Sequence, residues 1–351
     1  MKLTYSIPSF LVAFLISLTA QPDPLFSQAE FYRGKTITII QDRDPGGSGD
    51  LRVKVMMPFL QRHIPGNPTV ISEYMPGGGG RKAANYIFRS SRPDGLTIGN
   101  AGSSMVQLEI LGESGVLYSI DKFFYLGSTY SVYHPVFLTR KEAGLDSLAK
   151  LRAASGLRVG GQSVGFSTYI EGRLFTYVLR LKDPKFVTGY GGPELDPALL
   201  RGEIDARASG ADGILRTPEW LKGGVVDFHT IINIPKEEKH PQFSHLPELE
   251  SLARSDKDRK LIILQRAFRV AGAPYFLPPG TPKDRVEILQ EAFCKTYTDP
   301  EFHKEYKKIT GPDPTPLLPK DHEKVIKEIP RDSDVIELFK KIAGGEPLPP
   351  N

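Results

Sequence analysis

The chain has 351 residues, of which 40% are hydrophobic and 25% charged, and a formal net charge of +4. This length allows two lobes, and the composition is ordinary for a soluble globular protein. The charge is weak and scattered along the chain, so we expect no nucleic-acid partner. Cys294 is the single cysteine and the seven histidines show no ligand spacing, so we expect no disulfide, no metal and no cofactor.

The first 29 residues carry the features of an export signal. Lys2 gives a positive start, Pro8–Leu18 is an apolar run without charge, and Ser27-Gln28-Ala29 is a small-x-small cleavage motif. A membrane span needs about 20 apolar residues, so the pattern favours a signal peptide over an uncleaved anchor. We therefore predict that residues 1–29 are a signal peptide cleaved near Ala29 and that the mature protein is exported.

The chain then alternates strands and helices. This order predicts a parallel sheet with right-handed crossovers. Pro58, late in the first of these helices, is expected to kink that helix or end it early. The expected elements are strands at Thr36–Ile40, Thr69–Glu73 and Leu96–Gly99, and helices after Asp50 and at Arg81–Ser90.

A second series of the same kind follows an aromatic, strand-prone crossing at Phe123–Arg140, and Leu261–Pro274 leads back to the first. Two such crossings predict an α/β fold of two Rossmann-like lobes, with a hinge and a central ligand cleft. We place lobe I at residues 30–132 and 270–351, and lobe II at residues 133–269. The expected elements of lobe II are strands at Leu157–Gly161, Lys185–Tyr190, Ile204–Ser209 and Val225–Ile234, and helices at Ser167–Leu181 and Pro197–Arg201.

Two glycine-rich loops in matching strand–loop–helix positions are the candidate binding elements. Loop 1 is Asp44–Asp50 (DPGGSGD) and loop 2 is Gly160–Thr168 (GGQSVGFST). Glycines let backbone N–H groups approach an anion, and the helix that follows adds partial positive charge. Ser48 and the hydroxyls of loop 2 add donors, and Asp50 is expected to cap a helix. A plain connection is the alternative for each loop, but their matching positions favour a carboxylate clamp.

Other polar segments follow predicted strands. Met75–Gly80 lacks the Lys-Ser or Lys-Thr pair of a phosphate-binding loop, so we assign it a structural or cleft-edge role. Ser103 and Asp212 are expected to face the cleft. Arg207 is expected to form a solvated salt bridge with Asp205 or Asp212, and contact with a ligand carboxylate is the alternative.

The sequence resembles the extracytoplasmic solute receptors of tripartite tricarboxylate transporters, the Bug/TctC-like family. The resemblance runs from about Phe31 to Ile342 and is carried by the segments FYRGKTITII, PGGSGD, HIPGNPTVISEYMPGGGGRKAANYI, RPDGLTIG, GGQSVGFST and YFLPPGTPKDRVEILQEAF. It implies a periplasmic binding protein fold of type II. It also implies a monomeric, non-catalytic receptor in the periplasm that captures a small organic carboxylate. The receptor would pass its ligand to a two-component membrane permease driven by an ion gradient.

The resemblance further implies that the two loops hold the ligand carboxylate, largely through backbone N–H groups, hydroxyls and bridging waters. Asp44 and Gly49 depart from the usual family residues, and the charge of Asp44 suits a ligand with a polar or cationic end. The ligand-binding residues carried over by position are Pro45, Gly46, Gly47, Ser48, Asp50, Gln162, Ser163, Gly165, Ser167 and Thr168.

Two other functions remain open from the sequence. An exported α/β enzyme acting on a small carboxylate would consume its ligand, whereas a receptor returns it intact. A receptor domain used for signalling would report ligand occupancy to a sensor protein. We predict the transport receptor, without catalytic residues.

Overall fold

The first β-sheet takes strands from distant parts of the chain. The computed structural model describes residue 1 and residues 31–350. The strands of this sheet are β1 (Thr36–Gln41), β2 (Thr69–Tyr74), β3 (Thr97–Asn100), β4 (Phe124–Gly127) and β10 (Tyr275–Leu277). Their order is β2-β1-β3-β10-β4, with β1 parallel to β2 and β3, and β10 antiparallel to β3 and β4. We call this sheet and the helices around it lobe I.

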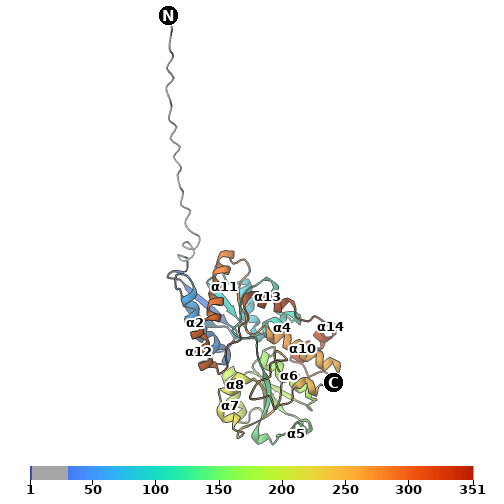
Figure 1. The fold of residues 1–351 in the computed structure, drawn as a ribbon. Coiled ribbons are helices and arrows are strands. Elements are labelled where there is room, and N and C mark those ends of the chain that lie inside the picture. The colour runs from blue at the N-terminus through green and yellow to red at the C-terminus, as the bar shows by residue number, and fades with distance from the viewer. Residues whose placement is uncertain (2–30, 351) are drawn as a thin grey trace.

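Helices cover the sheet of lobe I (Figure 1). Helix α2 buries Val53, Met56 and Leu60 in an apolar cluster with Phe302 and Tyr306, so it packs against α11 and α12. This packing fixes the N-terminal end of α2, which begins directly after loop 1. The helices of lobe I are α2 (Ser48–His63), α3 (Arg81–Arg89), α4 (Ser104–Ile110), α11 (Lys283–Thr298), α12 (Pro300–Thr310) and α13 (Pro319–Lys327).

The second sheet defines lobe II, which lies below lobe I in Figure 1. Its strands are β5 (Pro135–Arg140), β6 (Arg158–Gly160), β7 (Lys185–Val187), β8 (Ala206–Gly210) and β9 (Val226–Ile231), in the order β7-β6-β8-β5-β9. β6 is parallel to β7 and β8, whereas β5 is antiparallel to β8 and β9. Its helices are α5 (Leu148–Ala153), α6 (Ser167–Leu179), α7 (Leu195–Leu200), α8 (Ala211–Leu215) and α9 (Pro218–Leu221).

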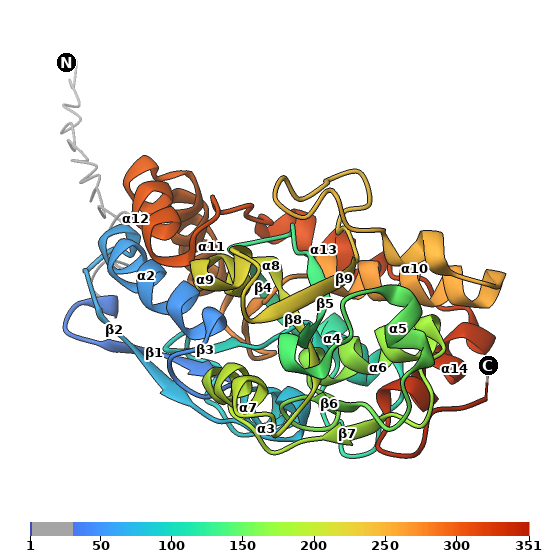
Figure 2. The ribbon, with the colours of Figure 1, turned by 90° about the horizontal axis from the view of Figure 1, so that it is seen from below.

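Two helices join the lobes. Figure 2 shows α10 (Asp256–Val270) and α14 (Ser333–Ala343) beside α6. Phe268 and Phe339 meet edge to face with ring centroids 5.5 Å apart, and α14 packs on α6. Arg173 of α6 also donates to the backbone oxygens of Ile342 and Glu346. The C-terminal part of the chain is therefore attached to lobe II as well as to lobe I.

The predicted βα order is confirmed, with corrections. Each sheet is mixed and not purely parallel, because the crossing strands β4, β5 and β10 run antiparallel to a neighbour. Helix α2 neither ends at Pro58 nor begins after Asp50: it runs from Ser48 to His63, with Gly47 as its N-cap. Pro58 is exposed, and so is Lys54, whose carbonyl loses its helix donor to the proline, so the missing hydrogen bond lies on the exposed side of the helix.

The return crossing at Leu261–Pro274 is mostly helical, because its apolar residues belong to α10. The predicted signal peptide lies outside the described residues apart from Met1, and the lobe boundaries at 132/133 and 269/270 stay predictions. No helix within residues 31–350 combines the length and the hydropathy that a bilayer span requires.

Candidate functional site

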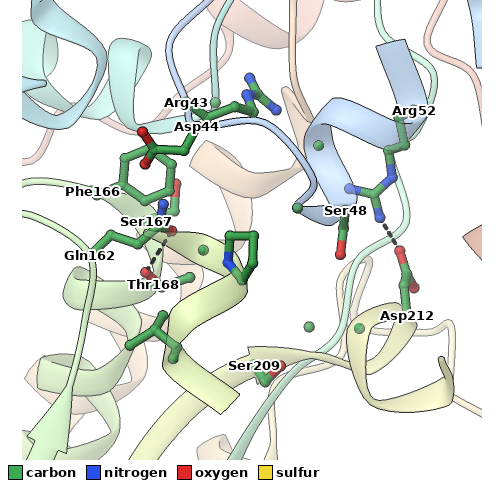
Figure 3. A pocket seen from close by; sticks show the side chains of 18 of the residues that line it. Arg43, Asp44, Ser48, Arg52, Gln162, Phe166, Ser167, Thr168, Ser209 and Asp212 are labelled. Carbon is green, nitrogen blue, oxygen red and sulfur yellow. Dashed lines mark hydrogen bonds and ion pairs between the residues drawn. The ribbon is translucent and has the colours of Figure 1, made fainter. Parts of the chain in front are cut away.

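A cavity of ≈ 190 Å³ lies between the two lobes. Figure 3 shows loop 1 and the start of α2 on its lobe I side, and the start of α6 and the segment after β8 on its lobe II side. The cavity is smaller than sites for drug-sized ligands, which hold about 300–1,000 Å³. Its size therefore suits a small metabolite.

Asp50 shapes loop 1 from behind the cavity. Its buried carboxylate accepts hydrogen bonds from Gly46 N at 2.7 Å, from Gln41 Nε2 at 2.9 Å and from Tyr74 OH at 2.9 Å. Lys54 Nζ lies 2.7 Å from the same group. Burial by itself raises the pKa of the Asp50 carboxyl, but these hydrogen bonds outweigh it and hold the pKa below its usual value. Asp50 therefore fixes the loop as an anion and does not line the cavity.

The glycines of loop 1 open the backbone towards the cavity. Gly46 has a backbone φ angle of +89°, which residues other than glycine rarely adopt. Gly47 is the N-cap of α2, and a Cβ added to it would meet no atom within 4 Å. Both glycines and Ser48 line the cavity. Because the first N–H groups of a helix have no intrahelical partner, the start of α2 presents donors and partial positive charge here.

Loop 2 presents the start of α6 from the other lobe. Gln162, Ser167 and Thr168 line the cavity, and Thr168 Oγ1 donates to Gln162 Oε1 at 3.2 Å. A Cβ on Gly79 would lie 2.7 Å from the backbone of Gly165. The loop Met75–Gly80 of lobe I therefore meets loop 2 at the edge of the cleft.

Arginines are the main feature of the cavity, and sequence reasoning considered only Arg207 among them as a ligand contact. The lining includes Arg43, Arg52, Arg207, Arg216 and Arg269. Guanidinium groups are preferred partners of carboxylates, because they offer paired donors in a fixed plane. Arg43 follows β1 and Arg207 lies in β8, whereas the other three lie in or directly after helices. Their sequence context does not separate any of them from surface arginines.

Arg207 differs from its expectation. It pairs with Asp196, and its side chain is 7% exposed. Asp205 forms ion pairs with Arg158 and Arg140, and Asp212 forms an ion pair with Arg52. The predicted solvated salt bridge with Asp205 or Asp212 is therefore wrong, because the ends of α7 and β8 bring Asp196 to Arg207 instead.

Arg269 forms the back wall of the cavity. Its Nε lies 3.0 Å from Glu171 Oε1 and its Nη1 donates to Ser103 Oγ at 2.9 Å. The guanidinium carbon stands 3.6 Å from the centroid of the Tyr133 ring. Complete burial raises the pKa of the Glu171 carboxyl to about 6, although Arg269 opposes the shift. Ser103, expected to face the cleft, stands behind Arg269.

Some of the predicted site residues line the cavity and others do not. Gly46, Gly47, Ser48, Gln162, Ser167, Thr168 and Asp212 line the cavity, whereas Pro45, Asp50, Ser103, Ser163 and Gly165 do not. Whether the first group contacts a ligand stays a prediction.

The expectation that the chain has no Gly-x-Ser-x-Gly sequence is wrong, because loop 2 contains one at Gly161–Gly165. In hydrolases this sequence places a nucleophilic serine at a strand-to-helix turn. Ser163 does not line the cavity, and no histidine is among the described lining residues. The geometry at this serine therefore gives no support to a hydrolase.

No family model and no curated protein matches the sequence, but solved structures do. A periplasmic binding protein, BugD, is 18% identical with a TM-score of 0.67, over 89% of this chain and 99% of that one. MatC from Rhodopseudomonas palustris, with bound malate, is 18% identical with a TM-score of 0.67, over 88% and 99%. A second R. palustris protein, with adipate, is 17% identical with a TM-score of 0.64, over 88% and 96%. At such identities the likeness shows the fold, and the chain has the two-lobed periplasmic binding protein fold.

Proposed function

We propose that the protein is a solute-binding receptor of the Bug/TctC-like family, which captures a small organic carboxylate between its lobes. One observation carries the proposal: the starts of α2 and α6 face a single cavity from opposite lobes. Helix starts and guanidinium groups stabilise an anion. The similar structures with malate and adipate support the same ligand class.

The receptor would work in the periplasm as a monomer after removal of residues 1–29. Ligand binding would favour the closed arrangement of the lobes, because only that arrangement brings both loops to the carboxylate. The closed form would then deliver the ligand to the permease subunits of a tripartite transporter. We propose no catalytic step and no cofactor.

A thermal-shift screen of the exported protein against small carboxylates tests the proposal. A ligand that binds only the folded state raises the melting temperature by mass action. We expect one or a few carboxylates to do so and to be recovered chemically unchanged. Consumption of the ligand would support the exported enzyme instead, and Ser163→Ala would then test loop 2 as its source. No shift with any carboxylate would contradict the receptor.

A further inference from the structure

Charged groups around the cavity pair almost completely with one another. Four of the five lining arginines have a carboxylate within ion-pair distance. Each arginine pairs with a different carboxylate, so the net charge of the four pairs is zero. The pairs are Arg43 with Asp42, Arg52 with Asp212, Arg207 with Asp196 and Arg269 with Glu171.

Arg216 is the remaining cation. It follows α8, and its Nη2 donates to the hydroxyl oxygen of Ser48 at the start of α2. Among residues 31–350 no carboxylate lies within ion-pair distance of it. Arg216 is exposed, and Arg52, Asp196 and Asp212 lie near enough to act on its charge. A bound anion would give it the direct ion-pair partner that the described residues do not provide. The Ser48 end of the cavity is thus the place for the ligand carboxylate.

Asp44 is the remaining anion. It is half-buried, lines the cavity and has neither a hydrogen-bond donor nor a cation as partner in the described part of the chain. Its Oδ2 lies 3.4 Å from the position of a Cβ on Gly191, and a Cβ on Gly192 would lie 3.7 Å from Gln162 Nε2. Asp44 is a loop 1 residue, but its carboxylate therefore lies at the end of the cavity that Gln162 of loop 2 lines. Figure 3 shows it across the cavity from Ser48 and Asp212.

We infer that the ligand is a zwitterion, with its carboxylate at Ser48 and Arg216 and an ammonium group at Asp44. The inference rests on the proposed function and narrows its ligand class to amino acids. A charge that leaves water needs a partner of opposite sign. One unpaired cation and one unpaired anion, at opposite ends of an otherwise neutral cavity, match a ligand with one charge of each sign. A dicarboxylate would place its second charge against Asp44.

Matched pairs of ligands test this inference by titration calorimetry of the exported protein. The probes are α- and ω-amino acids of two to six carbons, each beside the carboxylic acid that lacks the amino group. We expect the amino acid of the best pair to bind about tenfold to a hundredfold more tightly, which is typical of a charge-assisted hydrogen bond. Tighter or equal binding of the acid without the amino group would overturn the zwitterion but leave the receptor intact. No binding by any probe would also overturn the zwitterion, and the thermal-shift screen with other small carboxylates would then decide on the receptor.

Two variants locate the effect. Asp44→Asn is expected to remove the preference for the amino acid and to keep the affinity for the plain acid. The matched control is Glu194→Gln, because the Glu194 carboxylate lies 3.5 Å from the same Gly191 position, accepts a hydrogen bond from Gly191 N and does not line the cavity. This control should keep the preference. Asp44 has no protein partner to lose, so unchanged melting temperatures should show that both variants fold. A preference that survives Asp44→Asn would overturn the inference.

Discussion

Arg52 and Asp212 form an ion pair that joins the two lobes across the cavity. Arg52 Nε also donates to Tyr306 OH at 3.1 Å, and its guanidinium carbon lies 4.2 Å from the centroid of the Tyr130 ring. The two side chains are only 7% and 13% exposed. The lobes are therefore held together by a contact that needs no ligand, and closure is governed by the protein as well as by its solute.

Asp212→Asn should open the ligand-free protein. In the closed arrangement the variant leaves the Arg52 charge buried without its carboxylate, which costs about 3–5 kcal/mol. We expect a larger radius of gyration by small-angle X-ray scattering without ligand. Asp146→Asn is the control, because Asp146 pairs with Lys150 on the surface of lobe II. An unchanged radius in Asp212→Asn would refute the role of this pair in closure.

Gly47→Phe should fold normally and lose ligand binding. A Cβ at Gly47 meets no atom within 4 Å and the N-cap has φ −76°, so the new ring enters the cavity without backbone strain. We expect no thermal shift with any carboxylate that stabilises the native protein. Gly224→Phe adds the same side chain at another glycine with open space, and it should retain binding. Full binding by Gly47→Phe would remove loop 1 from the site.

Asp50→Ala should weaken binding although Asp50 does not line the cavity. The substitution leaves Gly46 N, Gln41 and Tyr74 without their acceptor, so loop 1 loses its shape. We expect a stability loss of about 2–3 kcal/mol in urea unfolding and a lower ligand affinity. Asp332→Ala removes a carboxylate that accepts from the first N–H groups of α14. It should cost about 1 kcal/mol and leave the affinity unchanged, and equal affinities in both variants would argue against a shaping role for Asp50.

Acid should destabilise the protein through His322. Complete burial lowers the pKa of His322 to about 3 from the ordinary histidine value of 6.5. Its ring stacks on that of Tyr125, with ring centroids 4.8 Å apart. Between these two pH values the unfolded chain binds a proton that the folded protein does not. The free energy of unfolding therefore falls as the pH drops from 6.5 towards 3, by at most about 5 kcal/mol from this group.

His322→Phe keeps the ring stack and should flatten this pH dependence in urea unfolding at pH 7 and pH 4.5. A part of the pH dependence should remain in this variant, because burial also lowers the pKa of His134 and of His229 to about 4. His245→Phe, at an exposed histidine, is the control and should retain the native slope. The same slope in both variants would contradict the assignment to His322.

Local patterns predicted most of the fold. The alternation of β-branched runs and amphipathic stretches located strands such as Thr36–Gln41 and helices such as Ser167–Leu179 to within a few residues. The two loops were found because both are rich in glycine and both stand between a strand and a helix, in matching positions of the two series. The helix Asp256–Val270 was only recognised as a crossing, since its buried arginines and glutamine interrupt the apolar pattern.

The charge arrangement of the cavity was not predictable from local sequence. Arg207 and Asp196 are 11 residues apart and on different elements, and Arg52 reaches Asp212 from the other lobe. Such pairs depend on the tertiary fold, and each arginine by itself looks like a surface residue. Asp44 is the one charge of the cavity that the sequence singled out, because it stands inside a loop predicted to bind an anion.

The most direct test of the receptor is a calorimetric titration of the exported protein with the carboxylate that gives the largest thermal shift, followed by chemical analysis of the recovered ligand. The account predicts one ligand per chain, recovered unchanged, and no binding to Gly47→Phe. Conversion of the ligand, or equal binding to Gly47→Phe, would contradict a receptor that holds its solute between loops 1 and 2.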